Sequence, residues 1–122
     1  MHADEITKEI LSSAFEVMNT LGCGFSEKVY ERALVEELRG RGFRVKAQAC
    51  LNVRYKGKAV GDYFADLVVE GEIVVELKCA ENLVPEHMAQ CINYLKASGM
   101  KVALLLNFQR SKLEWKRVVN DF

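Results

Sequence analysis

The stretch ADLVVEGEIVVELKC, residues 65–79, most constrains what this chain can fold into. Two largely apolar segments, 65–69 and 73–79, are joined by a turn centred on Gly71. Because successive side chains of a strand point to opposite faces, the apolar residues of these segments occupy both faces. A strand that is apolar on both faces is typical of a sheet that is covered on both sides. The hairpin therefore predicts a layered α/β protein.

The rest of the chain supplies the other elements of such a protein. Apolar residues at helical spacing predict three helices, over residues 4–21, 26–39 and 85–99, with Ser26 as an N-cap and Pro85 in a first turn. Five strands are predicted, over residues 43–55, 59–69, 73–79, 101–108 and 112–119, the last of which could be a short irregular end. Residues 43–55 alternate strictly, which predicts one solvated face. The order predicts a mixed α/β sandwich, with a three-stranded meander followed by an αβ unit, in one domain over 1–122.

Length and composition narrow the class of protein. A chain of 122 residues with 50% hydrophobic and 28% charged residues suits one globular domain. No apolar run approaches the roughly 20 residues that span a bilayer, and the polar N-terminus has no signal-peptide core. We therefore expect a soluble, cytoplasmic protein with no membrane partner. The four cysteines form no C-x-x-C pair, which favours reduced, buried thiols over a zinc site.

Charge is unevenly distributed although the net charge is zero. Residues 41–60 hold six basic and no acidic side chains, whereas residues 61–90 hold seven acidic side chains and one lysine. Such blocks could place a basic rim beside an acidic pocket. Solvated strand and helix faces would account for the same pattern.

Three charges interrupt the apolar hairpin: Asp66, Glu76 and Lys78. If Gly71 is the centre of an odd-length loop, Asp66 lies directly across from Glu76, with Cβ atoms about 5 Å apart. Two carboxylates at that distance repel each other. A divalent cation between them, such as Mg²⁺ or Mn²⁺, which prefers hard oxygen ligands, would make the electrostatic energy of the site favourable. The alternative is a salt-bridged cluster at the sheet edge, in which Lys78 pairs with Asp66 or Glu76.

These residues carry a family resemblance. Asp66 followed by Glu76-Leu77-Lys78 resembles the core motif of the PD-(D/E)XK nuclease superfamily. The segments GFSEKVY, AQCINYLKASG and LLLNF resemble the GxxExxY family, a branch of that superfamily, so that the resemblance covers nearly the whole chain. Ala65 stands where the family name has proline, and Gln109 stands where a glycine is usual. Neither departure affects the proposed site.

The resemblance implies a restriction-endonuclease-like core, with a central mixed sheet flanked by helices. It implies that Asp66 and Glu76 are metal ligands. It implies that Lys78 orients or activates the attacking water, or neutralises the scissile phosphate.

Other site residues are also implied by the resemblance. Glu27 matches a glutamate that many relatives supply from an early helix, as a third metal ligand, although an acid in a first turn also gains from the helix dipole. Gln90 and Tyr94, one helical turn apart, share a face that could point into the pocket, or they are surface polar residues. Tyr30 is expected to support the core, and Gly24 to adopt unusual backbone angles.

The implied activity is a Mg²⁺- or Mn²⁺-dependent nuclease that hydrolyses phosphodiester bonds in nucleic acid, with DNA favoured. The basic block 41–60 could hold the nucleic-acid backbone without reading bases. The alternatives are a catalytically inactive nuclease-like module for nucleic-acid binding or protein assembly, and a metal-free structural protein in which Lys78 pairs with both acids. A homodimer is a further possibility, because the chain is small for a nuclease that must also select a substrate.

Overall fold

The computed structural model describes residues 1–120; the last two residues of the predicted domain lie outside the described part. The helices are α1 (Ala3–Leu21), α2 (Glu27–Gly40) and α3 (Pro85–Ser98). The strands are β1 (Val45–Tyr55), β2 (Lys58–Val69), β3 (Ile73–Lys78), β4 (Val102–Asn107) and β5 (Glu114–Val119). The predicted order of elements is confirmed, and the C-terminal segment is a regular strand.

One five-stranded sheet has the strand order β1-β2-β3-β4-β5. The first three strands form the predicted antiparallel meander, and β4 and β5 are also antiparallel. Strands β3 and β4 are parallel, so the chain must cross over between them, and α3 makes that crossover. Val69 pairs with Ile73, which places the centre of the turn at Gly71, as the odd-length loop requires.

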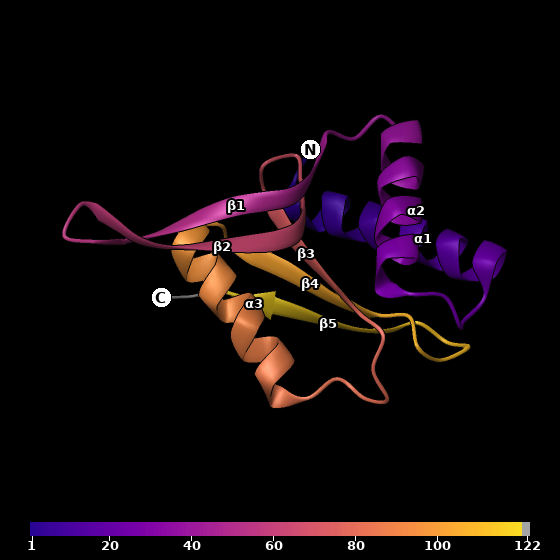
Figure 1. Ribbon diagram of the computed structural model, residues 1–122. Helices are drawn as coiled ribbons and strands as arrows, with labels where there is room; N and C mark the ends of the chain where they lie inside the picture. The colour runs from indigo at the N-terminus through magenta and orange to yellow at the C-terminus, as the bar shows by residue number, and fades with distance from the viewer. Residues whose placement is uncertain (121–122) are drawn as a thin grey trace.

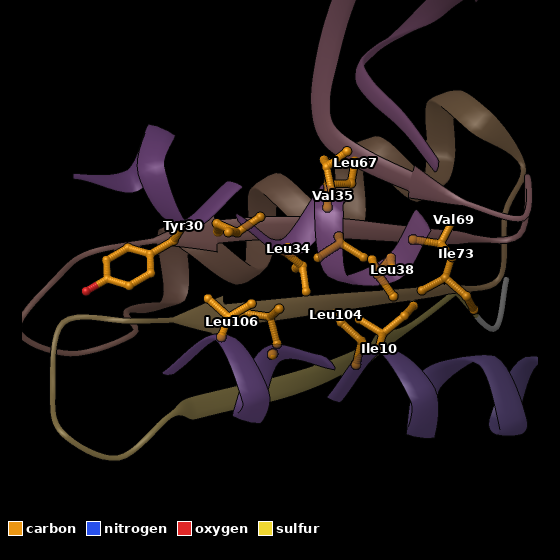
Figure 2. Close-up of a cluster of buried hydrophobic side chains, with 14 of the residues drawn as sticks. Ile10, Tyr30, Leu34, Val35, Leu38, Leu67, Val69, Ile73, Leu104 and Leu106 are labelled. Atoms are coloured by element: carbon orange, nitrogen blue, oxygen red, sulfur yellow. The ribbon is translucent and has the colours of Figure 1, made fainter. Parts of the chain in front are cut away.

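Helices cover both faces of the sheet (Figure 1). Helices α1 and α2 pack on one face, where Tyr30, Leu34 and Leu38 meet side chains of β3 and β4 (Figure 2). Helix α3 packs on the other face through Cys91, Tyr94 and Leu95. Every residue of β4 and all but the last residue of β3 are buried. The prediction of a sheet covered on both sides is therefore confirmed.

Strand β1 exposes the residues that its alternation predicts to be solvated, but these residues do not share a single face. Val45 packs against the core beneath α1 and α2, whereas Ala49 and Leu51 belong to the core beneath α3. Strict alternation would have put these three side chains on one face. Gln48 lies between them with φ of 50°, a left-handed conformation that breaks the alternation.

The neighbouring strand changes faces at the same level. Leu67 packs beneath α1 and α2, but Ala65 packs beneath α3, and Asp66 lies between them. The pairs on either side show that Gln48 and Asp66 stand opposite each other. Beyond this level the β1–β2 hairpin leaves β3 and projects past α3 (Figure 1). Its outer part is exposed and includes Tyr55, Val60 and Phe64.

The structure bears on two predictions made from composition, one about the cysteines and one about membrane-spanning helices. All four cysteines are free, and Cys91 is buried, but Cys23 and Cys50 are exposed, so the prediction of buried thiols is wrong for these two. Cys23 lies in the turn between α1 and α2, and Cys50 lies on the projecting hairpin. Within residues 1–120, no helix is long and apolar enough to cross a membrane.

Candidate active site

Asp66 and Glu76 face each other where β2 separates from β3. The last regular pair of these strands is Leu67 with Val75, and the two acids are the next residues along the ladder. The backbone N–H of Asp66 donates to Oε1 of Glu76 (3.1 Å), and the N–H of Leu77 donates to Oδ2 of Asp66 (2.8 Å). Each carboxylate thus accepts a backbone N–H of the other strand, at the point where the ladder ends. The predicted opposition of the two acids is present.

The fold raises the cost of ionising both acids. Glu76 is 4% exposed, and burial, followed by the charge of Asp66, raises the pKa of its carboxyl to about 8. Burial also raises the pKa of Asp66, and the nearby charge of Glu31 adds to the rise, although the N–H of Leu77 counteracts it. A positive charge between the two carboxyls would favour their ionised forms.

Lys78 supplies a positive charge on the same face as Glu76. Its Nζ lies 3.8 Å from Oε2 of Glu76, and the side chain is partly exposed. In the described residues no ion pair joins Lys78 to Asp66. The trio occupies β2 and β3 inside the sheet rather than a sheet edge. The charge of Lys78 lowers the pKa of Glu76 less than the charge of Asp66 raises it.

Helix α3 brings Gln90 and Tyr94 towards the acids. Nε2 of Gln90 donates to the hydroxyl of Tyr94 (2.9 Å), so the two side chains share one face of the helix. Tyr94 is buried, and burial, followed by the charges of Glu76 and Asp66, raises the pKa of its phenol to about 12. The hydroxyl therefore stays protonated and can donate a hydrogen bond at neutral pH.

Glu27 belongs to the first turn of α2 and lies beside the segment that follows β3. Its Oε2 accepts the backbone N–H of Cys79 (3.2 Å), the residue that follows Lys78. Ser26 caps the helix by accepting the N–H of Val29 (3.4 Å), as predicted. In residues 1–120 no group of three or more histidine, cysteine, aspartate or glutamate side chains is arranged to hold a metal ion.

The turn before α2 sets the position of Glu27. Gly24 has φ of 112°, which confirms the unusual backbone angles expected there. The hydroxyl of Tyr30 donates to the carbonyl of Gly22 and accepts the N–H of Phe25 (3.3 Å). Its ring is fully buried and stacks on Phe108 at 4.7 Å, so Tyr30 supports the core as predicted.

Glu31 and Gln48 reach the site although sequence reasoning missed them. Glu31, 7% exposed, accepts Nε2 of Gln48 (2.8 Å) and pairs with Lys28 (3.0 Å). The same Nε2 lies 3.5 Å from Oδ1 of Asp66. The spacing of four from Glu27 could have revealed Glu31, because residues i and i+4 share a helix face. Nothing in the alternation of β1 indicates Gln48, whose orientation depends on its left-handed backbone.

The geometry defines a class of protein. Its members would have a layered α/β fold, with two opposed acids and a lysine at the centre of the sheet. A family model described as the PD-(D/E)XK nuclease superfamily matches residues 4–118. The chain therefore belongs to the PD-(D/E)XK nuclease superfamily. The match does not resolve the GxxExxY branch, which stays a prediction.

Two solved structures share the fold. The crystal structure of the protein SSO0001 aligns with a TM-score of 0.61 and 16% identity, over 78% of this chain and 50% of that one. An alkaline exonuclease from Laribacter hongkongensis aligns with a TM-score of 0.52 and 15% identity, over 88% of this chain and 76% of that one. The chain thus spans only half the length of SSO0001. Among curated proteins no significant match was found.

Proposed function

We propose that this chain is a metal-dependent nuclease that hydrolyses phosphodiester bonds in nucleic acid, with DNA as the favoured substrate. The observation that carries the proposal is the opposition of Asp66 and Glu76 at the opening between β2 and β3, with Lys78 beside them. Membership of a nuclease superfamily and a fold shared with an alkaline exonuclease support it.

The acid pair fits a divalent cation. Mg²⁺ is usually held by one or two carboxylates, with water and substrate phosphates completing its shell, so two opposed carboxylates are a sufficient protein contribution. Asp66 and Glu76 would hold the ion, and Glu27 is the third proposed ligand. When bound, Mg²⁺ or Mn²⁺ lowers the pKa of a bound water and offsets charge on the phosphate.

The other residues act on the substrate and the water. The Lys78 ammonium would orient the attacking water or offset charge that develops on the phosphate, which burial makes more effective than it would be in bulk water. Tyr94, held by Gln90, would donate a hydrogen bond from the α3 side of the acids. These roles need fixed positions, which the neighbouring strands and α3 provide.

Cleavage assays with matched variants test the proposal. Labelled single-stranded and double-stranded DNA and RNA would be incubated with Mg²⁺ or Mn²⁺. Glu76→Gln should reduce the cleavage rate by about 100-fold or more. Lys78→Ala should lose cleavage while still binding Mn²⁺ in calorimetric titration. Glu72→Gln, an exposed carboxylate in the turn of the same hairpin, should behave as the parent does.

Two results would overturn the proposal. Cleavage that is unchanged in both Glu76→Gln and Lys78→Ala would show that this site does not carry the activity. Absence of cleavage, together with the lack of any Mn²⁺ site that depends on Glu76, would favour the inactive nuclease-like module.

A further inference from the structure

A groove of about 720 Å³ lies between the projecting β1–β2 hairpin and the C-terminal half of α3. Arg54 and Tyr63 line it from the hairpin, and Asn93 and Lys96 line it from the helix. Among the described residues that line it, none is acidic. The charged side chains of this described lining, Arg54 and Lys96, are both basic, and they come from opposite walls.

The groove leads towards the acid pair. A second hollow of about 400 Å³ is lined by Gln90 and Tyr94, and it shares Tyr63 and Asn93 with the groove. The rings of Tyr63 and Tyr94 meet edge to face, with centroids 6.1 Å apart. Tyr94 in turn is close enough to Glu76 for the carboxylate to raise the pKa of its phenol. The two hollows thus run from Arg54, past Tyr63, to Gln90 and Tyr94 of the candidate active site.

We infer that this groove binds a single strand of nucleic acid and leads it to the acid pair, an inference that rests on the proposed function. Tyr63 is 45% exposed, so its ring offers a face on which an unpaired base can stack. Arg54 and Lys96 supply the positive charges that follow a phosphate backbone. A duplex encloses the faces of its bases, so it would leave Tyr63 without a stacking partner.

Equilibrium binding to the full chain tests the groove. Fluorescence anisotropy with a labelled single-stranded oligonucleotide would be measured in EDTA, which removes divalent cations and so prevents the proposed cleavage. The single strand should bind more tightly than the duplex of the same sequence. Tyr63→Ala should weaken binding about tenfold or more, and Tyr63→Phe, which keeps the ring, should bind as the parent does.

Salt dependence tests the two basic residues separately. Each phosphate contact contributes about 0.7 to the slope of log Kd against log salt for a single strand. Arg54→Ala and Lys96→Ala should each lower that slope by about this amount. Lys8→Ala removes an exposed lysine of α1, which does not border the groove, and should leave the slope unchanged.

The two exposed cysteines provide a footprint of the bound strand. Cys50 lines the groove, whereas Cys23 lies in the turn between α1 and α2. The oligonucleotide should slow alkylation of Cys50, measured by mass spectrometry, and leave that of Cys23 unchanged. Equal affinity for single strand and duplex, unchanged binding by Tyr63→Ala, or equal protection of both thiols would overturn the inference.

The inference and the proposed function can fail separately. Metal-dependent cleavage that is lost in Glu76→Gln, together with groove variants that bind as the parent does, would overturn the groove and leave the nuclease intact. Loss of strand binding in the groove variants, without cleavage under any metal, would retain the groove and overturn the proposed catalysis.

Discussion

The carboxyl of Glu76 has different proton affinities in the folded and unfolded chain. Its pKa rises from an ordinary value of 4.5 to about 8 in the fold, because the side chain is buried and Asp66 stands opposite. Between these two values the folded state holds a proton that the unfolded state has released. The free energy of unfolding therefore falls as pH increases through this window, in the absence of divalent cations.

Glu76→Gln should remove much of that fall. Each pKa unit corresponds to about 1.4 kcal/mol, so the parent should lose a few kcal/mol of stability between pH 5 and pH 8.5, whereas the variant should lose less. Denaturant unfolding in EDTA at the two pH values measures the difference.

The control for this prediction is Glu72→Gln, since Glu72 is an exposed acid of the adjacent turn. This variant should follow the parent. The raised pKa of Asp66 acts in the same direction as that of Glu76. A pH dependence that is identical in parent and Glu76→Gln would contradict the assignment of the shift to Glu76.

At the scale of elements, the change of faces at Gln48 and Asp66 is the main feature of the β1–β2 hairpin. One left-handed residue in β1 turns the outer half of the hairpin towards α3. The same residue directs its side chain to Glu31 and Asp66. The inner half of the hairpin thus belongs to the site, and the outer half forms one wall of the groove.

Substitutions at Gln48 should separate backbone strain from side-chain contacts. Glycine adopts a positive φ without the penalty that a Cβ brings, so Gln48→Gly should be more stable than Gln48→Ala by about 1 kcal/mol. At Lys46, in the same strand but without a positive φ, the order should reverse, because glycine weakens an ordinary strand. Chemical denaturation of the four variants measures both differences; the same order at both positions would contradict the role of φ at Gln48.

At the scale of the whole molecule, the candidate site joins the two layers of helices. The acids stand on β2 and β3, Glu27 of α2 contacts Cys79 just beyond β3, and Tyr94 approaches from α3. A cation held by the acids would bind the folded chain and not the unfolded one, and it would therefore stabilise the entire domain.

Mn²⁺ should accordingly raise the melting temperature. At 100 times its Kd the ion contributes about 2.7 kcal/mol, which for a domain of this size corresponds to roughly 10 °C. The shift should be larger at pH 8.5 than at pH 6, where the ion must displace the proton of Glu76. Scanning calorimetry measures it. Asp66→Asn should abolish the shift, and a variant that retains it would place the ion elsewhere.

Much of the fold could be predicted because it depends on local patterns. The hairpin that is apolar on both faces predicts the layers, and the helical spacing predicts the order of elements. The odd-length turn at Gly71 predicts the opposition of Asp66 to Glu76. The structure shows all three. The exposure of alternate residues in 43–55 could be predicted, but their division between two faces could not, because one positive φ at Gln48 reverses the alternation.

The sequence by itself determined which charges enter the apolar hairpin, since strand parity and turn length are properties of consecutive residues. Only the tertiary structure decided which other groups meet them. Glu31 and Gln48 come from α2 and β1, Glu27 lies beside Cys79, and the groove forms between a hairpin and a helix that are distant in the chain. Such contacts depend on how the layers pack and on where a strand separates from its neighbour, and no short segment contains that information.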